Sequence, residues 1–287
     1  MEQNQLSSEE VGEMSEERTR CIRILMAVAM IAGMMIASLP AWAVDLPKAG
    51  RDIALKWHDA IIPVKAVIKL RIVVEGREVE NREYEIEDVA AVIDPSGLAV
   101  LSLSSIDPGE LLNEYAAASS DKYSVSSDVT SLKMILPGDV ETLSKIVLRD
   151  KDLDLAFIAP SVKPDSPAVA LDLKQIGKPE VLDPVIILSR FGKIANRELS
   201  VTLNRIQTII RKPKTFYIPE QQTTGLRTGS AVFTAEGKLA GVLLLKRIKP
   251  QREAFLSSND LKVLPIVVSA DDITEIVKQI AASGKVN

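Results

Sequence analysis

Beyond residue 62 the apolar residues fall in short runs rich in Val, Ile and Leu, and near residue 85 they alternate with polar residues at the period of two that is typical of β-strands. Residues 67–74 form a run rich in Val and Ile that two basic residues interrupt, and a polar turn follows at residues 75–77. Tyr84 and Ile86 then alternate with glutamates. This pattern predicts a β-hairpin with one solvent-facing side.

Short β-rich runs recur through the rest of the sequence, separated by turns rich in Gly, Pro, Asp and Ser. They lie at residues 90–93, 99–103, 132–136, 145–148, 155–158, 185–188, 199–209, 216–218, 231–233, 239–245 and 264–267. Many short strands at this spacing favour a β-barrel or β-sandwich architecture. The polar, Ser-rich stretch 116–131 predicts a surface loop.

Two stretches carry apolar residues at helical spacing. The first covers residues 48–60, ahead of the first strand. The second covers about 270–283 and is the clearer helix, because Ser269 is a favourable N-cap, two aspartates follow in the first turn, and Gly284 ends it. Its apolar side chains are Ile273, Ile276, Val277 and Ile280.

The first 43 residues have the features of a targeting segment. Three arginines precede the uncharged stretch 24–37, and Ala41-Trp42-Ala43 has the small-x-small pattern of a cleavage site. We expect a secretory signal peptide that is cleaved after Ala43; the alternative is an uncleaved anchor formed by residues 22–39. The only cysteine, Cys21, lies in this leader, so the sequence from residue 44 on excludes disulfides and thiol chemistry.

Composition narrows the classes of function. The chain is 46% hydrophobic but only 4% aromatic, which predicts a globular core of aliphatic residues. Beyond residue 43 it has 32 basic and 33 acidic residues, and this balance argues against nucleic acid as a partner. We expect no metal and no cofactor, because the sequence has neither clustered ligand residues nor a Gly-rich phosphate loop.

Four segments, in order, resemble the trypsin-like serine protease domain in its HtrA/Deg branch. The first resembles the hairpin before the catalytic His, the second the stretch with the catalytic Asp, the third the strands around the nucleophile, and the fourth the end of the domain. These segments are residues 92–102, 136–158, 228–242 and 264–266, the last with the helix that follows it. In that branch a PDZ domain follows the protease domain, and here we expect none.

The resemblance implies an all-β fold of two six-stranded antiparallel β-barrels with a C-terminal α-helix. Barrel one then covers about 63–162 and barrel two about 180–268, with the C-terminal helix at 270–283. Residues 44–62 form a helical segment ahead of the barrels. The strand count and the order of the motifs agree with this architecture.

The positions that correspond to the catalytic triad depart from the family pattern. The His position falls on Ser104 or Ser105, depending on a register shift of one residue, and the Asp position is kept as Asp154. The Ser position falls on Thr228. In the loop that forms the oxyanion hole, the equivalents of the family residues are Leu226, Arg227, Gly229 and Ser230, so two of the three glycines of the motif are replaced.

These replacements remove the chemistry of the triad. A hydroxyl group near neutral pH is a poor nucleophile without an adjacent base, and a serine at position 104 or 105 cannot accept the proton. The only histidine, His58, precedes the first strand and is not placed by the motif. We therefore expect no catalytic residue, and we interpret Asp154 as a buried acceptor of hydrogen bonds that ties strands together.

Three hypotheses for function remain. The first is an exported pseudoprotease of the periplasm or cell envelope, which binds a peptide or protein segment or acts as a scaffold. The second is a residual or rewired serine-type endopeptidase of the HtrA type, for which the sequence identifies no base. The third is a structural subunit of an envelope assembly. The sequence leaves the oligomeric state and the partner open, and it predicts membrane contact only through an uncleaved leader.

Overall fold

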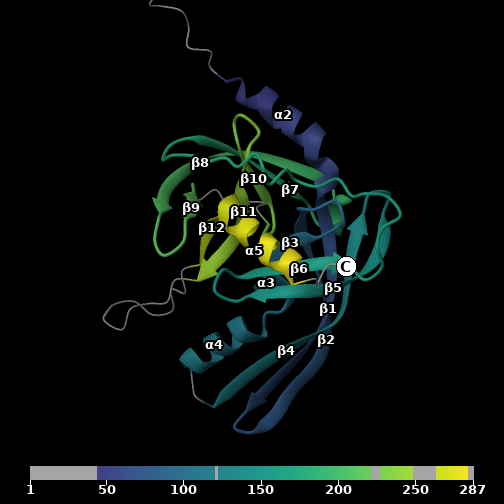
Figure 1. Cartoon of the computed structure of the whole chain (residues 1–287). Coiled ribbons are helices and arrows are strands. Elements are labelled where there is room, and N and C mark those ends of the chain that lie inside the picture. Colours follow the sequence, from purple (N-terminus) through teal and green to yellow (C-terminus); the bar gives the residue numbers. More distant parts are fainter. Residues whose placement is uncertain (1–43, 120–121, 221–226, 248–262, 284–287) are drawn as a thin grey trace, which may run out of the picture. The chain divides into compact units, whose positions relative to one another are not determined.

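The computed structural model describes residues 44–119, 122–220, 227–247 and 263–283. Two closed antiparallel β-barrels of six strands each make up most of this part (Figure 1). The expected fold class is therefore confirmed, and it is consistent with a trypsin-like double barrel. The leader and its expected cleavage site lie outside the described residues.

Barrel one closes in the strand order β1-β2-β3-β6-β5-β4. Its strands are β1 (Ile61–Val74), β2 (Arg77–Val92), β3 (Ala99–Ser102), β4 (Tyr123–Leu136), β5 (Val140–Asp150) and β6 (Leu155–Pro160). The predicted hairpin forms between β1 and β2, and Glu75 and Gly76 in its turn have φ values of 49° and 77°. Two consecutive residues with positive φ are typical of the tight turns that match the twist of a hairpin.

Barrel two closes in the order β10-β11-β12-β9-β8-β7. Its strands are β7 (Pro184–Arg190), β8 (Leu199–Ile210), β9 (Phe216–Pro219), β10 (Ala231–Thr234), β11 (Leu239–Arg247) and β12 (Val263–Ser269). Aliphatic side chains fill the interiors of both barrels, as the composition predicted, and Phe157 and Phe233 are the largest fully buried side chains.

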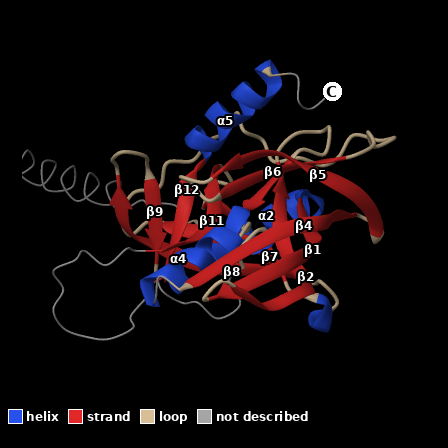
Figure 2. Cartoon of the chain, turned by 90° about the horizontal axis from the view of Figure 1, so that it is seen from below, coloured by secondary structure: helices blue, strands red, loops and turns tan. Residues whose placement is uncertain are grey.

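The helices lie around the barrels (Figure 2). They are α2 (Leu46–Trp57), the 3₁₀ helix η1 (His58–Ala60), α3 (Leu103–Ile106), α4 (Gly109–Ser119), the 3₁₀ helix η2 (Lys193–Ala195) and α5 (Ala270–Ala282). Helix α5 has the expected N-cap, because the Ser269 hydroxyl accepts the backbone N–H of Asp272 at 3.2 Å. Ile273 and Ile280 on its apolar face are buried, as predicted. No described helix is long and apolar enough to cross a membrane.

The prediction of a surface loop at 116–131 is wrong. The stretch contains the end of α4 and the first half of β4, and β4 pairs with β1 along a curved sheet that α4 covers (Figure 1). Val125, Ser127 and Val129 are half-buried and alternate with exposed residues. This polar stretch is therefore a strand with one half-buried face. Gly109 allows the start of α4 to lie directly on β4, since a Cβ there would be 2.3 Å from the Ser127 nitrogen.

Candidate functional site

Asp154 lies in the turn between β5 and β6, with a φ of 57°. Its carboxylate accepts hydrogen bonds from the Ser102 hydroxyl at 2.7 Å, the Ser104 backbone N–H at 2.7 Å and the Ser104 hydroxyl at 3.0 Å. Burial raises the pKa of Asp154 in spite of these donors. The side chain thus joins the end of β3 and the start of α3 to the turn before β6.

The two serines at the His position have different surroundings. Ser104 contacts Asp154, whereas the Ser105 hydroxyl donates to the carbonyl oxygen of Ser102 at 2.8 Å and lies beside Asp88. Both hydroxyls are therefore engaged in local hydrogen bonds. Neither group can take a proton from a nucleophile as an imidazole does.

Thr228, at the nucleophile position, donates its hydroxyl proton to Asp88 on β2, with 2.5 Å between Thr228 Oγ1 and Asp88 Oδ2. Asp88 is 6% exposed. Burial raises the pKa of Asp88, and the hydrogen bonds from Ser105, Thr228 and the Val89 N–H oppose this effect. The structure thus places a buried carboxyl group next to the nucleophile position.

The sequence analysis missed Asp88. The signal that was available is its place in the chain, directly before the apolar residues 89–93 and directly after the charged half of β2. A charged residue at that border is usually exposed, but here Ser105 of α3 and Thr228 before β10 both lie against Asp88, which is 6% exposed.

The loop that would form an oxyanion hole packs against barrel one. The Arg227 guanidinium donates to the carbonyl oxygen of Glu87, and its Nε lies 3.8 Å from Asp88 Oδ1. Gly229 has a φ of 79°, and a Cβ at this position would lie 1.8 Å from the carbonyl oxygen of Val89. The turn after Thr228 therefore lies in direct contact with the backbone of β2. Leu226 lies outside the described residues.

Ser230, the other hydroxyl in this loop, is fully buried. It donates to the carbonyl oxygen of Arg227 at 2.5 Å and lies 2.7 Å from the hydroxyl of Ser189. Its hydroxyl therefore holds the loop against β7 and is not presented to a substrate.

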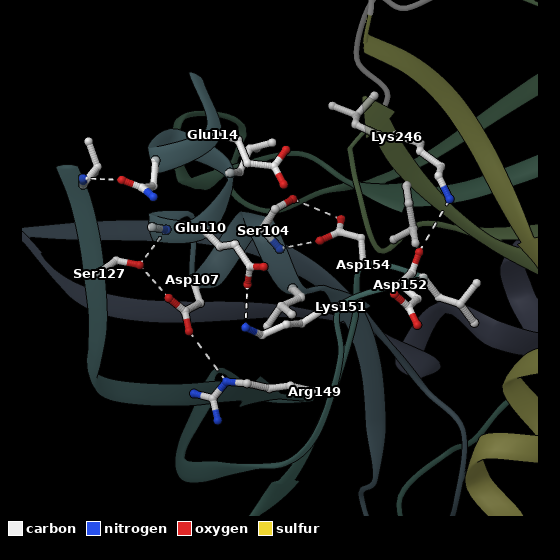
Figure 3. Close-up of a pocket in the computed structure, with 18 of the residues that line it drawn as sticks. Ser104, Asp107, Glu110, Glu114, Ser127, Arg149, Lys151, Asp152, Asp154 and Lys246 are labelled. Carbon is white, nitrogen blue, oxygen red and sulfur yellow. Dashed lines mark hydrogen bonds and ion pairs between the residues drawn. The ribbon is translucent and has the colours of Figure 1, made fainter. Parts of the chain in front are cut away.

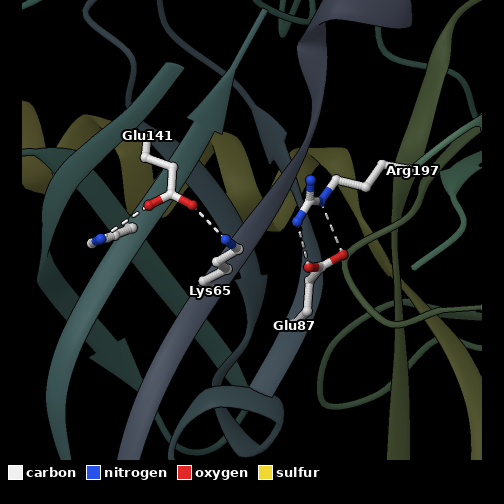
Figure 4. A network of polar contacts seen from close by, with 5 residues as sticks. Lys65, Glu87, Glu141 and Arg197 are labelled. Atoms are coloured by element: carbon white, nitrogen blue, oxygen red, sulfur yellow. Dashed lines mark hydrogen bonds and ion pairs between the residues drawn. The ribbon is translucent and has the colours of Figure 1, made fainter. Parts of the chain in front are cut away.

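An ion pair joins the two barrels next to this loop (Figure 4). Both carboxylate oxygens of Glu87 accept hydrogen bonds from Arg197, at 3.2 Å and 3.0 Å. Arg197 precedes β8, whereas Glu87 belongs to β2, and both side chains are less than one fifth exposed. Bidentate geometry and partial burial make this pair stronger than an ordinary surface ion pair.

The structure does not bring His58 into this site. Its Nδ1 lies 3.1 Å from the carbonyl oxygen of Leu55, its Nε2 lies 3.3 Å from Asp59, and half of the side chain is exposed. His58 contributes only its backbone to the junction of the barrels, because its carbonyl oxygen accepts a hydrogen bond from Arg190 at 2.6 Å.

A groove of about 750 Å³ lies beside Asp154 (Figure 3). Helix α4 and the start of β4 (residues 125–127) line one side, and Leu244, Leu245 and Lys246 of β11 line the other. The Lys246 ammonium group lies 4.6 Å from the centre of the Phe216 ring and 3.5 Å from the carbonyl oxygen of Asp152.

Charged side chains inside the groove form pairs (Figure 3). Lys151 lies 2.7 Å from Glu110, and Arg149 lies 3.6 Å from Asp107. The remaining lining mixes apolar and polar side chains. Among the residues that the structure describes, no group of His, Cys, Asp or Glu is placed to hold a metal ion.

The residues that the family resemblance assigns to the triad form two separate hydrogen-bonded groups. Asp154 and Ser104 remain together, Ser105 and Thr228 meet at Asp88, and the oxyanion loop packs on β2. Comparison of the chain with models of known protein families finds no match, and neither does comparison with curated protein sequences.

Proposed function

We propose that this chain is an exported pseudoprotease of the HtrA type, which binds extended peptide segments in the periplasm or cell envelope without cleaving them. The observation that carries the proposal is the hydrogen bonding at the triad positions. Ser104 stands where a base is needed, and the Thr228 hydroxyl is bonded to the buried Asp88. Hydrolysis of an amide by this mechanism requires a base and a free nucleophilic hydroxyl group. Because a serine replaces the base and the threonine hydroxyl is already hydrogen-bonded, both observations support binding without catalysis.

The edge of β11 beyond Leu243, which no described strand pairs with, supports the binding part of the proposal. The N–H of Leu243 donates to Ser230, and its carbonyl oxygen accepts from Gly229, both at 2.8 Å. Beyond Leu243, no described residue forms a backbone hydrogen bond with β11 on this side, whereas β12 pairs with its other side as far as Arg247. Backbone groups point to alternate sides of a strand, so those of Leu245 face the open edge.

An extended peptide can add to such an edge as a further strand, with its side chains entering the neighbouring groove. Leu245 is 48% exposed and Lys246 also lines the groove, so this edge is accessible to a ligand. The ligand class is therefore an extended or unfolded protein segment that supplies backbone donors and acceptors.

The absence of catalysis is tested with unfolded casein as the substrate. We expect no cleavage by the wild-type protein at high concentration, and the same result for the Thr228→Ala, Ser230→Ala double variant. Cleavage by the wild type that the double variant lacks would refute the proposal of a non-catalytic protein.

Binding is tested by fluorescence anisotropy with a labelled, unfolded casein peptide. Leu245→Pro removes the outward N–H at the open edge, and we expect it to weaken binding about tenfold. Leu245→Ala keeps the N–H and removes most of the side chain, so it is the matched control and is expected to change the Kd less than about threefold. Equal losses in both variants would show that the strand edge is not the binding element.

One observation favours a second candidate, a rewired hydrolase. Asp88 is a carboxyl group with a raised pKa within hydrogen-bond distance of Thr228 Oγ1, and such a group can act as a general base. A fluorophosphonate probe distinguishes the two candidates. Labelling at Thr228 that Asp88→Asn abolishes would favour the hydrolase, and no labelling at high probe concentration would favour the pseudoprotease.

A further inference from the structure

A second cavity, of about 550 Å³, lies between the C-terminal half of α5 and barrel one. Val277, Ile280 and Ala281 line it from the helix, and Leu98, Ala159 and Pro160 line it from the barrel. Leu98, Ala159 and Ile280 are buried, so they form an apolar floor. Its volume lies within the range that is usual for small-molecule sites.

The rim of this cavity is positively charged. Lys145 on β5 and Lys163 after β6 both line it, both are exposed, and neither forms an ion pair with a described residue. The lining has one carboxylate, Asp94, which accepts the backbone N–H of Ser96 at 2.8 Å, so the two lysines outnumber the acidic side chains. The rim therefore offers two ammonium groups to an anion.

The turn between β2 and β3 adds a hydrogen-bonding group to the same cavity. The Ser96 hydroxyl oxygen is buried and has no hydrogen-bond partner among the described residues. Gly97, with a φ of 87°, lets the turn approach Pro160 closely, since a Cβ would lie 2.9 Å from Pro160 Cγ. A buried polar group without a partner is uncommon in a folded protein, and a ligand atom would satisfy it.

We propose that this cavity binds an anionic amphiphile, namely a medium-chain fatty carboxylate, with its carboxylate at Lys145 and Lys163 and its chain on the floor beneath α5. An inorganic anion would leave the apolar floor uncovered, and an uncharged hydrocarbon would form no ion pair with the two lysines and no hydrogen bond with the Ser96 hydroxyl. The site is separate from the groove beside Asp154 and does not rest on the proposed function.

Isothermal titration calorimetry with decanoate, below its micelle concentration, tests the proposal on the purified protein. We expect saturable binding of decanoate, and binding at least about tenfold weaker for decanol and for inorganic phosphate. No saturable heat with decanoate, or equal affinity for decanol, would overturn the proposal.

Variants locate the site. Lys145→Met with Lys163→Met removes both charges but keeps most of each apolar stem, and we expect the affinity for decanoate to fall about tenfold or more. Lys69→Met with Lys238→Met removes two other exposed charges and is the matched control, expected to leave the affinity unchanged. Ala281→Trp fills the cavity from the exposed side of α5 and is expected to abolish binding. Unchanged affinity in both site variants would contradict the assignment.

Discussion

Thr228→Val measures the contribution of the hydrogen bond between the nucleophile position and Asp88. Valine has nearly the same shape as threonine, so the substitution removes the donor to Asp88 without opening a cavity. Asp88 is 6% exposed and would lose the donor that lies 2.5 Å from its Oδ2 atom. Hydrogen bonds to charged groups contribute about 1.5–3 kcal/mol, so we expect the free energy of unfolding at pH 7 to fall by about 2 kcal/mol.

The same substitution in an Asp88→Asn background isolates the pair. Asparagine keeps the size of the side chain but carries no charge, and a hydrogen bond between neutral groups contributes only about 1 kcal/mol. Thr228→Val is therefore expected to cost about 1 kcal/mol less in this background than in the wild type. The difference between the two losses is the coupling energy of the threonine hydroxyl with the carboxylate.

Urea unfolding of the purified protein at pH 7, followed by circular dichroism, gives these free energies. Thr130→Val is the matched control, because the Thr130 hydroxyl donates to the carbonyl oxygen of Val67 at 3.1 Å on the exposed face of β4. We expect the control to change the stability by less than about 0.5 kcal/mol. The reasoning is refuted if Thr228→Val is as stable as the wild type, or if it costs the same in both backgrounds.

Three further predictions concern packing and charge. Gly229→Ala places a Cβ against the carbonyl oxygen of Val89 at a positive φ, and it is expected to cost about 3 kcal/mol or more in urea unfolding; a loss below about 1 kcal/mol would show that the loop can move. The pKa of Asp88 is raised in the folded state, so its carboxyl group binds a proton more tightly there than in the unfolded chain. Ionisation of Asp88 therefore lowers the free energy of unfolding as the pH rises from about 4 through the raised pKa. Asp88→Asn should therefore gain stability relative to the wild type across that rise, and a constant difference between the two proteins from pH 4 to 8 would contradict this. The pKa of Glu141 is about 2, and the hydrogen bond from Lys65 is the largest cause of this low value. In the Lys65→Met variant, NMR titration should therefore show the pKa of Glu141 rising toward 4.5. An unchanged pKa would show that another group is responsible.

Local patterns in the sequence were sufficient for the all-β class, but they left a barrel and a sandwich open, and only the family resemblance implied two six-stranded barrels. The alternation at 67–86, the turn at 75–77 and the short runs up to residue 267 predicted an all-β fold, and Ser269 predicted the start of α5. They failed at 116–131, where small polar residues suggested a loop. Pairing with β1 makes the second part of that stretch a strand, and this pairing is a tertiary interaction that composition does not report.

The sequence alone shows that no histidine falls at the His position of the family motif, whereas only the structure shows that His58 lies at Leu55 and Asp59, away from Asp154 and Thr228. What replaces the triad was decided by the tertiary structure. Thr228 and Asp88 lie 140 positions apart, in different barrels, and they meet only because Gly229 allows the loop to lie on the backbone of β2. Asp88 is buried between this loop and Ser105 of α3, and its burial raises its pKa. Periodicity encodes which face of a strand is buried, but hydrogen bonds between distant side chains depend on how the two barrels pack.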